Sequence, residues 1–206
     1  MVRISLKASC GAVILAGGLN IRMDGRNKAL LELGGQTIVA RLVERLREIF
    51  SQIVLVTREP APYAQLPVKV VSDIYAARSS LTGIHAGICN LDAEYAFVVP
   101  CDTPFLQPAL VDLLLDALAP GVDVVIPFFE GHFQPLCAIY SKRSLAAIES
   151  QLERDAFKII DIFDQLEVRT VPLEKLKIAD PHMLSFFNVN TPADFQVCKQ
   201  LFYQHG

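Results

Sequence analysis

Residues 11–31 read GAVILAGGLNIRMDGRNKALL, a short apolar run followed directly by a loop that is rich in glycine and positive charge. The run GAVILA has the length and the branched side chains of a strand that is buried on both faces of a sheet. Similar runs recur along the chain, and segments with helical spacing of apolar residues separate them. This alternation predicts a three-layer, Rossmann-like α/β fold with a mostly parallel sheet and helices on both faces. The expected strands are residues 11–16, 52–57, 68–73, 95–102, 122–127, 134–140 and 167–173.

The expected helices lie between these strands. Thr37 is a suitable N-cap for the first long helix, and a short helix over 81–91 is expected to begin near Gly83. The last helix is expected to have Thr191 as its cap and Pro192 at its first position. The expected helical segments are 38–50, 81–91, 108–118, 142–152, 155–165 and the stretch from 192 onward.

Composition and charge narrow the class of protein. Of the 206 residues, 52% are apolar and 20% are charged, which suits a single packed domain over residues 1–206. The net charge of -3 argues against a general nucleic-acid binder, because such proteins normally carry a basic face.

Targeting features are also missing from the sequence. The N-terminal MVRISLKAS lacks the apolar core of a signal peptide, and no run approaches the roughly 18 apolar residues of a membrane span. The five cysteines are scattered without C-x-x-C spacing, as is typical of free thiols in a reducing compartment. We therefore expect a cytoplasmic protein with no nucleic-acid and no membrane partner.

The loop after the first strand has the chemistry of a phosphate site. Arg22, Arg26 and Lys28, offset by Asp24, give residues 19–28 a local charge of about +2. Flexible amides beside cationic side chains at the carboxyl end of a strand suit a polyphosphate, although a solvated surface loop is the alternative. The loop matches neither the P-loop pattern nor the dinucleotide-binding pattern G-x-G-x-x-G.

Two aspartates follow apolar strands at the same edge of the expected sheet. Asp102 ends the run YAFVVPCD, where a carboxylate must be solvated, paired or bound to a metal. Asp73 ends VKVVSD in the same geometric position. The alternative for both residues is a turn acid at a strand end. Ligands of such sheets bind beyond the carboxyl ends of the strands, so both are candidate site residues.

Four stretches in order resemble the motifs of sugar-nucleotide-type nucleotidyltransferases, and most of all those of the molybdenum cofactor guanylyltransferases. They are LAGGLNIRMDGRNKALLELGG, VVSD before LTGIHAG, VPCDTPFL and FFNVNTPADF. A further stretch, QPLCAIY, is similar to the segment that faces the cofactor in that family. The pieces span residues 15–195, which is nearly the whole chain.

This resemblance implies transfer of GMP from GTP to molybdenum-bound molybdopterin, with Mg²⁺, or Mn²⁺ in its place, as cofactor. Lys28 would lie against the triphosphate, with Arg22 as a second phosphate contact. Asp102 would hold the metal, and Asp73 would read the guanine or its ribose. The residues whose backbone would line the nucleotide and its phosphates are Leu15, Ala16, Gly17 and Gly18.

The family motifs also suggest where the acceptor binds. Asn188 and Asn190 flank one residue of an extended stretch, so their side chains should point the same way. Gln134 and Pro135 are further candidates for contact with molybdopterin. Where the family usually has glycine after Arg-Met, this chain has Asp24, which should turn away from the ligand because its charge would repel phosphate. The resemblance further implies transient contact with the proteins that mature molybdoenzymes.

Several alternatives remain open on the residues alone. The sister activity uses CTP, and other nucleotidyltransferases act on sugar or alcohol phosphates. A nucleotide-binding adaptor without turnover and a dehydrogenase are more distant alternatives. Cys101 and Cys137 are expected to pack as small apolar residues. The histidines show neither metal-ligand spacing nor a paired acid, so surface or packing roles are expected for His85, His132, His182 and His205.

Overall fold

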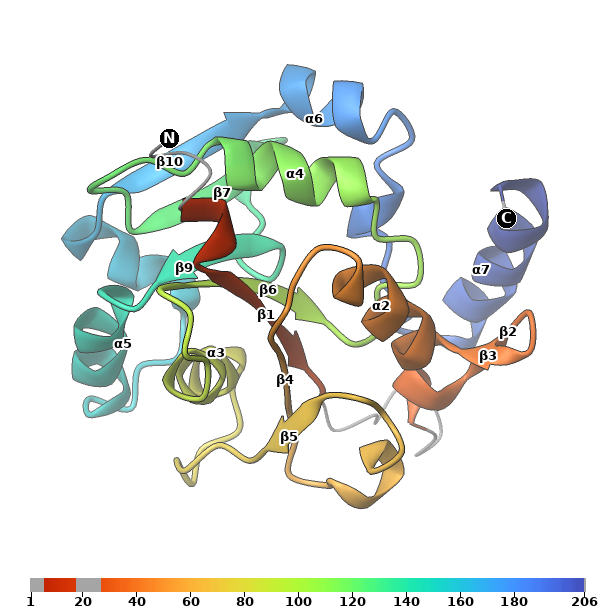
Figure 1. Cartoon of the computed structure of the whole chain (residues 1–206), viewed down its shortest axis with the longest axis horizontal. Coiled ribbons are helices and arrows are strands. Elements are labelled where there is room, and N and C mark those ends of the chain that lie inside the picture. Colours follow the sequence, from red (N-terminus) through yellow and green to blue (C-terminus); the bar gives the residue numbers. More distant parts are fainter. Residues whose placement is uncertain (1–5, 18–26, 206) are drawn as a thin grey trace.

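A central sheet with helices on both faces forms the body of the protein (Figure 1). The computed structural model describes residues 6–17 and 27–205. In these residues the main sheet has eight strands, in the order β10-β7-β9-β6-β1-β4-β5 with β8 paired to β7. Their bounds are β1 (Cys10–Leu15), β4 (Ile53–Val56), β5 (Lys69–Val71), β6 (Tyr95–Pro100), β7 (Val124–Phe129), β8 (His132–Phe133), β9 (Ala138–Ser141) and β10 (Val168–Pro172).

The strand order reverses at β1, which lies in the middle of the sheet. β1 pairs in parallel with β4 on one side and with β6 on the other. From β1 the chain continues outward through β4 and β5, and then returns to the opposite side of β1 as β6. β9 is antiparallel to both of its neighbours, so the sheet is mixed but mostly parallel, as predicted. Such a reversal leaves a crevice beyond the carboxyl ends of the two central strands.

Alternate side chains of β1 enter two separate cores. Ala12 and Ile14 pack on one face, whereas Val13 packs on the other. Helices α2, α4 and α6 cover the first face, and α3, α5 and the 3-10 helix η4 cover the second (Figure 1). Their bounds are α2 (Ile38–Arg47), α3 (Ser80–Cys89), α4 (Pro108–Asp116), α5 (Ser144–Leu152), η4 (Ile159–Gln165) and α6 (Leu173–Ala179).

The helix starts follow local capping chemistry. The side chain of Thr37 caps α2, as predicted from the sequence. The expected start of the next helix at Gly83 is wrong, because Ser79 caps α3 and forms a reciprocal capping box with Thr82. Gly83 lies inside the helix, where an added Cβ would come within 3.0 Å of the Leu15 side chain. This glycine therefore lets α3 lie close against the end of β1.

Two other segments differ from the sequence-based expectation. The helix expected over 155–165 is replaced by the shorter η4, because Asp155 has a φ of 52° and the chain turns there. The strand expected over 134–140 begins only at β9, because residues 134–137 form a turn closed by the Cys137 amide donating to the Gln134 carbonyl. Helix α6 and strand β8 were not expected.

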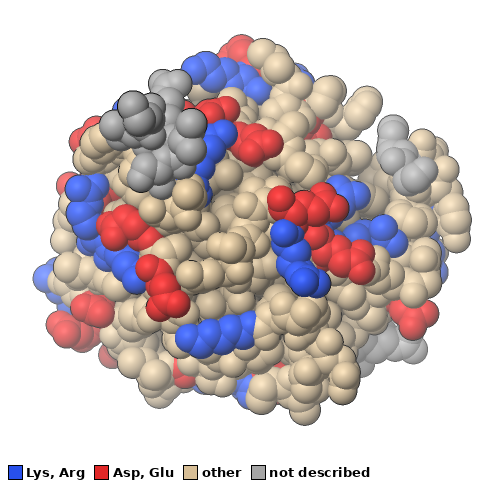
Figure 2. Space-filling model, viewed as in Figure 1, with Lys and Arg blue, Asp and Glu red and all other residues tan. Residues whose placement is uncertain are grey.

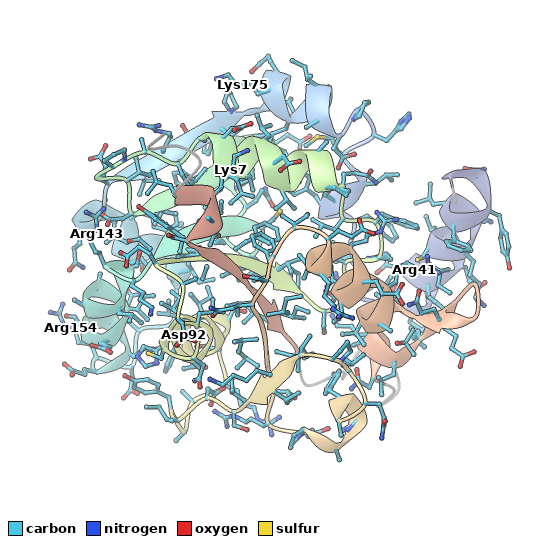
Figure 3. The ribbon with its side chains drawn as sticks, in the orientation of Figure 1. Lys7, Arg41, Asp92, Arg143, Arg154 and Lys175 are labelled. Atoms are coloured by element: carbon cyan, nitrogen blue, oxygen red, sulfur yellow. The ribbon has the colours of Figure 1, made fainter. Side chains whose placement is uncertain are left out.

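The C-terminal helix α7 (Pro192–His205) packs beside α2. Its start is capped as predicted, since the Asp194 amide donates to Thr191 Oγ1 and the Asp194 carboxylate accepts from the Thr191 amide. The guanidinium of Arg41 lies over the Phe202 ring at 4.7 Å from its centroid, between α2 and α7 (Figure 3). This contact joins the last helix to the rest of the fold.

The hydropathy of the helices and the distribution of surface charge are two further features of the fold. No helix within residues 6–17 and 27–205 is both long and apolar enough to cross a membrane. Positive and negative side chains are interspersed over the face shown in Figure 2.

Candidate functional site

A cavity of about 410 Å³ opens at the crevice between the carboxyl ends of β1 and β6. Leu15 and Gly17 line it from the end of β1, and Cys101 and Asp102 line it from the end of β6. Thr57 contributes from the end of β4. The volume falls within the range of about 300–1,000 Å³ that is typical of small-molecule sites. The cavity therefore lies where the reversal of strand order predicts ligand binding.

Lys28 reaches the cavity from η2 (Lys28–Leu30), which follows the glycine-rich loop. The Asn27 side chain caps this short helix by accepting from the Ala29 amide, and its Nδ2 donates to the Tyr63 hydroxyl at 2.9 Å. Lys28 Nζ forms an ion pair with Asp102 Oδ2. Its side chain is 19% exposed, so the ammonium is partly desolvated. The cap and the ion pair together hold one positive charge inside the cavity.

Asp102 is a buried carboxylate, and only one of its two oxygens has a partner among the described residues. Oδ2 pairs with Lys28, but Oδ1 is buried and has no hydrogen-bond partner in the described part of the chain. A buried polar atom of this kind is costly unless a ligand satisfies it. Mg²⁺ is commonly held by one or two carboxylates together with water and phosphate oxygens. The residues present therefore fit a divalent cation at Asp102 that faces the cavity.

The stretch before α7 closes one side of this centre. The Val189 amide donates to the Asp102 carbonyl at 3.0 Å, and Thr103 Oγ1 donates to Asn188 Oδ1 at 3.0 Å. Asn190 Oδ1 accepts from Lys28 Nζ at 2.9 Å. Asn188 and Asn190 both line the cavity, in agreement with the predicted common direction of their side chains. Amide groups from the C-terminal part of the chain thus surround the Lys28–Asp102 pair.

Asp73 lines the opposite side of the cavity, where Arg58 holds it. Arg58 Nη2 donates to Asp73 Oδ1 at 2.7 Å, and the same guanidinium donates to the carbonyls of residues 75–77 at 2.5–3.1 Å. Asp73 Oδ2 accepts from Thr82 Oγ1 at 3.4 Å, which links the loop to α3. Both carboxylate oxygens of Asp73 therefore have protein partners, and the pair fixes the wall formed by residues 73–79.

The first turn of α3 also faces the cavity. Ser79, Ser80 and Gly83 line it, and Arg78 adds a cationic side chain directly before the helix. Ser79 Oγ accepts from the Thr82 amide, but the other N–H groups of a helical first turn lack intrahelical partners, and the helix end carries partial positive charge that favours anions. Lys28 and this helix end therefore face a shared space with positive potential from two sides, a good environment for a polyphosphate.

Comparison with known proteins assigns the chain to a family. A family model described as "MobA-like NTP transferase domain" matches residues 12–169, more than half of the chain. The chain belongs to the MobA-like NTP transferase family. This family assignment agrees with the fold, because the sheet, its flanking helices and the cavity at β1 and β6 all lie mainly within the matched residues.

Individual relatives support the MobA-like assignment. The chain is 36% identical over 184 residues to a molybdenum cofactor guanylyltransferase from Desulfosudis oleivorans, covering 89% of this chain and 91% of the relative. The crystal structure of molybdopterin-guanine dinucleotide biosynthesis protein A from Archaeoglobus fulgidus superposes with a TM-score of 0.82 at 26% identity, covering 94% of this chain and 99% of that one. A cytidylyltransferase from Leptospira borgpetersenii, at 16% identity, has a TM-score of 0.72 with coverages of 96% and 88%. At that identity the likeness shows the fold alone.

The structure of this MobA-like chain brings most of the predicted site residues together. Ala16 is half-buried next to the cavity-lining residues at the end of β1, and its amide donates to the Val56 carbonyl. Gln134 and Pro135 are not among the residues that line the cavity, whereas the next residue, Leu136, is. The predicted residues outside the described part of the chain are Gly18, Arg22, Asp24 and Arg26.

Space, and not backbone conformation, explains the glycine at position 17. The φ of Gly17 is not in the left-handed region, so its backbone does not require glycine. An added Cβ would meet no described heavy atom within 4 Å, because the position opens into the cavity. Glycine therefore preserves space for a ligand at this position.

Sequence reasoning missed several cavity residues. Arg58 and Arg78 were not singled out from the sequence, because their only signal is their position at the end of a strand and at the start of a helix. The expectation that no histidine has a paired acid is wrong for His85, whose Nε2 lies 3.0 Å from Glu149 Oε1. That contact joins α3 to α5, two helices far apart in the sequence.

The cysteines near the site behave as predicted. All five cysteines of the chain are free. Burial raises the pKa of Cys101 and of Cys137 to about 12, so both thiols are protonated at neutral pH. Neither can serve as a thiolate nucleophile under these conditions, and both pack as small apolar side chains.

Proposed function

We propose that the protein is a molybdenum cofactor guanylyltransferase. It transfers GMP from GTP to the terminal phosphate of molybdenum-bound molybdopterin. An oxygen of that phosphate attacks the α-phosphorus of GTP, and the bond between the α-phosphorus and the bridging oxygen breaks. The products are molybdopterin guanine dinucleotide and diphosphate. The observation that carries this proposal is the buried Asp102, which pairs with Lys28 and has one oxygen without a hydrogen-bond partner within residues 6–17 and 27–205. It lies where the strand order of this MobA-like fold reverses.

Lys28 and the start of α3 would bind the triphosphate. Lys28 and the first turn of α3 both line the cavity, so phosphate oxygens between them would be neutralised from two directions. The charge on the diphosphate increases as it leaves, and a preorganised ammonium stabilises that charge more than it stabilises the bound substrate. Asn190 orients Lys28 for this role through its 2.9 Å hydrogen bond.

Asp102 would hold a Mg²⁺ ion, or Mn²⁺ in its place, through the oxygen that has no protein partner. Such an ion, when bound, neutralises phosphate charge and polarises the phosphorus–oxygen bonds. The ion pair with Lys28 fixes the orientation of this cavity-lining carboxylate and leaves its buried Oδ1 for the ion.

The acceptor does not need a general base. A phosphate monoester has a second pKa of about 6, so its attacking oxygen is already ionised at neutral pH. The contribution of the protein is then to align the two phosphates, and Asn188 and Asn190 on the wall next to Asp102 are our candidates for that contact.

The wall formed by residues 73–79 would receive the guanine base or its ribose. Thr57, Arg58 and Asp73 surround that part of the cavity. Since Arg58 and Thr82 occupy the Asp73 carboxylate, we assign Asp73 the role of shaping the wall together with Arg58. Backbone groups of the wall and Arg78 would then contact the nucleoside directly.

We also propose that residues 1–206 act as a single nucleotidyltransferase domain in the cytoplasm. One continuous sheet carries every strand end that borders the cavity, and five free cysteines suit a reducing compartment. The partners would be GTP and the molybdenum-bound molybdopterin, with transient contact to the proteins that mature molybdoenzymes.

A thermal-shift screen with GTP, CTP, ATP and UTP in the presence of Mg²⁺ tests nucleotide recognition. A ligand at 100 times its Kd stabilises the native state by about 2.7 kcal/mol, which raises the melting temperature by several degrees. We expect GTP to give the largest shift. A screen in which no nucleotide raises the melting temperature would contradict the proposed function.

A further inference from the structure

Three potential metal ligands converge on the second face of the sheet, beyond the first turn of α3 that lines the nucleotide cavity. His85 and Cys89 lie four residues apart on α3, so their side chains project from the same face of that helix. Glu149 reaches toward them from α5, which packs beside α3 on that face (Figure 1). Among the described residues these three form a group whose ligand atoms all lie within 4.8 Å of one another.

The distances in this group suit a tetrahedral cation. His85 Nε2 lies 3.0 Å from Glu149 Oε1 and 3.6 Å from Cys89 Sγ. In a tetrahedral zinc site with Zn–N of about 2.0–2.1 Å and Zn–S of about 2.3 Å, the nitrogen and sulfur are separated by about 3.6 Å. The His85–Cys89 spacing already has this value, and the His85–Glu149 spacing is within a few tenths of an ångström of the roughly 3.3 Å that two light-atom ligands of a tetrahedral zinc would have. Cys89 Sγ and the Glu149 carboxylate oxygen lie within 4.8 Å of each other.

Burial and charge also favour a cation at this position. His85 is 4% exposed, and its other ring nitrogen, Nδ1, has no hydrogen-bond partner in the described part of the chain. The polar contacts of the imidazole are therefore concentrated on the side of Nε2, where the Glu149 side chain is 47% exposed and open to solvent. Cys89 is the last residue of α3, and the C-terminal end of a helix carries partial negative charge.

We propose that His85, Cys89 and Glu149 form a binding site for a thiophilic divalent cation of the Zn²⁺ type. Neutral imidazole, thiolate and carboxylate are a ligand set that favours zinc over Mg²⁺, which prefers oxygen ligands. Binding releases the thiol proton of Cys89 to solvent, and a water molecule completes the fourth position. The bound ion would link α3 to α5, and thereby stabilise the helix whose first turn lines the nucleotide cavity.

The test uses the full-length protein after removal of metal with a chelator. Zn²⁺ binding is measured by competition with a chromogenic chelator, in excess Mg²⁺ so that Asp102 is not available. We expect one high-affinity Zn²⁺ per chain. Co²⁺ in place of Zn²⁺ should give a thiolate-to-metal charge-transfer band, which reports directly on a bond to sulfur. Cys89 is the exposed cysteine among the five, so Zn²⁺ should also slow alkylation of the native protein.

Variants separate this site from non-specific binding. Cys89→Ser and Glu149→Gln should each weaken Zn²⁺ at least about 10-fold, because each removes one of three ligands. Cys89→Ser should also abolish the Co²⁺ charge-transfer band. Glu153→Gln is the matched control, since Glu153 is an exposed carboxylate at the end of the same helix and should leave affinity unchanged. Equal Zn²⁺ affinity in wild type and Cys89→Ser, or no stoichiometric binding to the wild type, would overturn the proposal.

Discussion

Replacing Asp102 with asparagine removes one negative charge from the buried centre and leaves the shape of the side chain nearly unchanged. In the wild type, Oδ2 pairs with Lys28 and Oδ1 has no partner in the described residues. The substitution therefore has two separate consequences. It leaves the Lys28 ammonium without its counter-charge, and it removes the anionic oxygen that would hold a divalent cation.

The cost to stability follows from how buried the pair is. Removing one partner of a fully buried ion pair typically costs about 3–5 kcal/mol. Lys28 is 19% exposed and keeps its hydrogen bond to Asn190, so we expect a loss of only about 1–2 kcal/mol. For a chain of this size that corresponds to a decrease in melting temperature of roughly 2–8 °C. The variant should remain folded at 25 °C.

The cost to catalysis should be larger. Loss of a metal ligand at the reacting phosphates should remove about 3–4 kcal/mol of transition-state stabilisation, which is a decrease in rate of about 10²–10³-fold. Binding of GTP without metal should not weaken, because Lys28 no longer shares its charge with Asp102 and a repulsive carboxylate is gone. Binding and turnover should therefore separate in this variant.

The assay is diphosphate release across a Mg²⁺ titration, with GTP affinity measured in parallel in the absence of metal. Asp116→Asn is the matched control, because Asp116 is 59% exposed and pairs with Lys7 far from the cavity. The control should retain wild-type turnover. If Asp102→Asn also retains wild-type turnover with the same Mg²⁺ midpoint, the cation is held elsewhere and Asp102 has only a structural role.

Three further substitutions test other parts of the site, and Gly87→Ala serves as a comparison for packing. Lys28→Ala should slow transfer by about 10²-fold and weaken GTP binding, because the phosphates lose contact with a preorganised positive charge. Unchanged kinetics would show that Lys28 is an ordinary surface charge with no role in the reaction. Gly17→Val should leave the melting temperature nearly unchanged but prevent GTP binding, because its side chain enters open cavity space. Gly87→Ala should instead destabilise the fold, because its Cβ would come within 2.3 Å of a β1 side chain. Normal GTP affinity in a folded Gly17→Val protein would show that the phosphates lie elsewhere. Arg58→Lys should weaken GTP binding by about 10-fold with little loss of Mg²⁺ dependence, because lysine cannot reproduce the guanidinium fork that holds the wall of residues 73–79. Equal Kd values for GTP in the wild type and the variant would show that this wall does not contribute to nucleotide binding.

The main elements of the fold could be predicted because their signals are local. Runs such as YAFVVP are apolar on both faces, which only a central strand between two helical layers can bury. The segment 155–165 misled because its apolar spacing is helical while Asp155 adopts a left-handed conformation that the pattern does not reveal. Helix α6 has only seven residues, too few for a clear periodic signal.

The site could be predicted only where a motif names the residue. Lys28 and Asp102 belong to recognisable motifs. These motifs follow β1 and β6, which are neighbours in the sheet, so the strand order brings the two side chains together. Arg58 was missed because its role depends on carbonyl groups of residues 75–77, and backbone acceptors leave no trace in the amino-acid pattern. The His85–Glu149 contact was missed for a related reason, since it exists only because α3 and α5 share a face of the sheet.

Transfer of a nucleotide to molybdenum-bound molybdopterin, measured with GTP and CTP in parallel, tests the proposed function most directly. Diphosphate release and formation of the dinucleotide product should be followed together at equal nucleotide concentration with Mg²⁺. We predict that GTP is used at least about 10-fold more efficiently than CTP, a difference of about 1.4 kcal/mol that a few hydrogen bonds to the base can supply. Equal use of both nucleotides, or a preference for CTP, would contradict the guanylyltransferase assignment, and the absence of diphosphate release with either nucleotide would contradict nucleotidyl transfer itself.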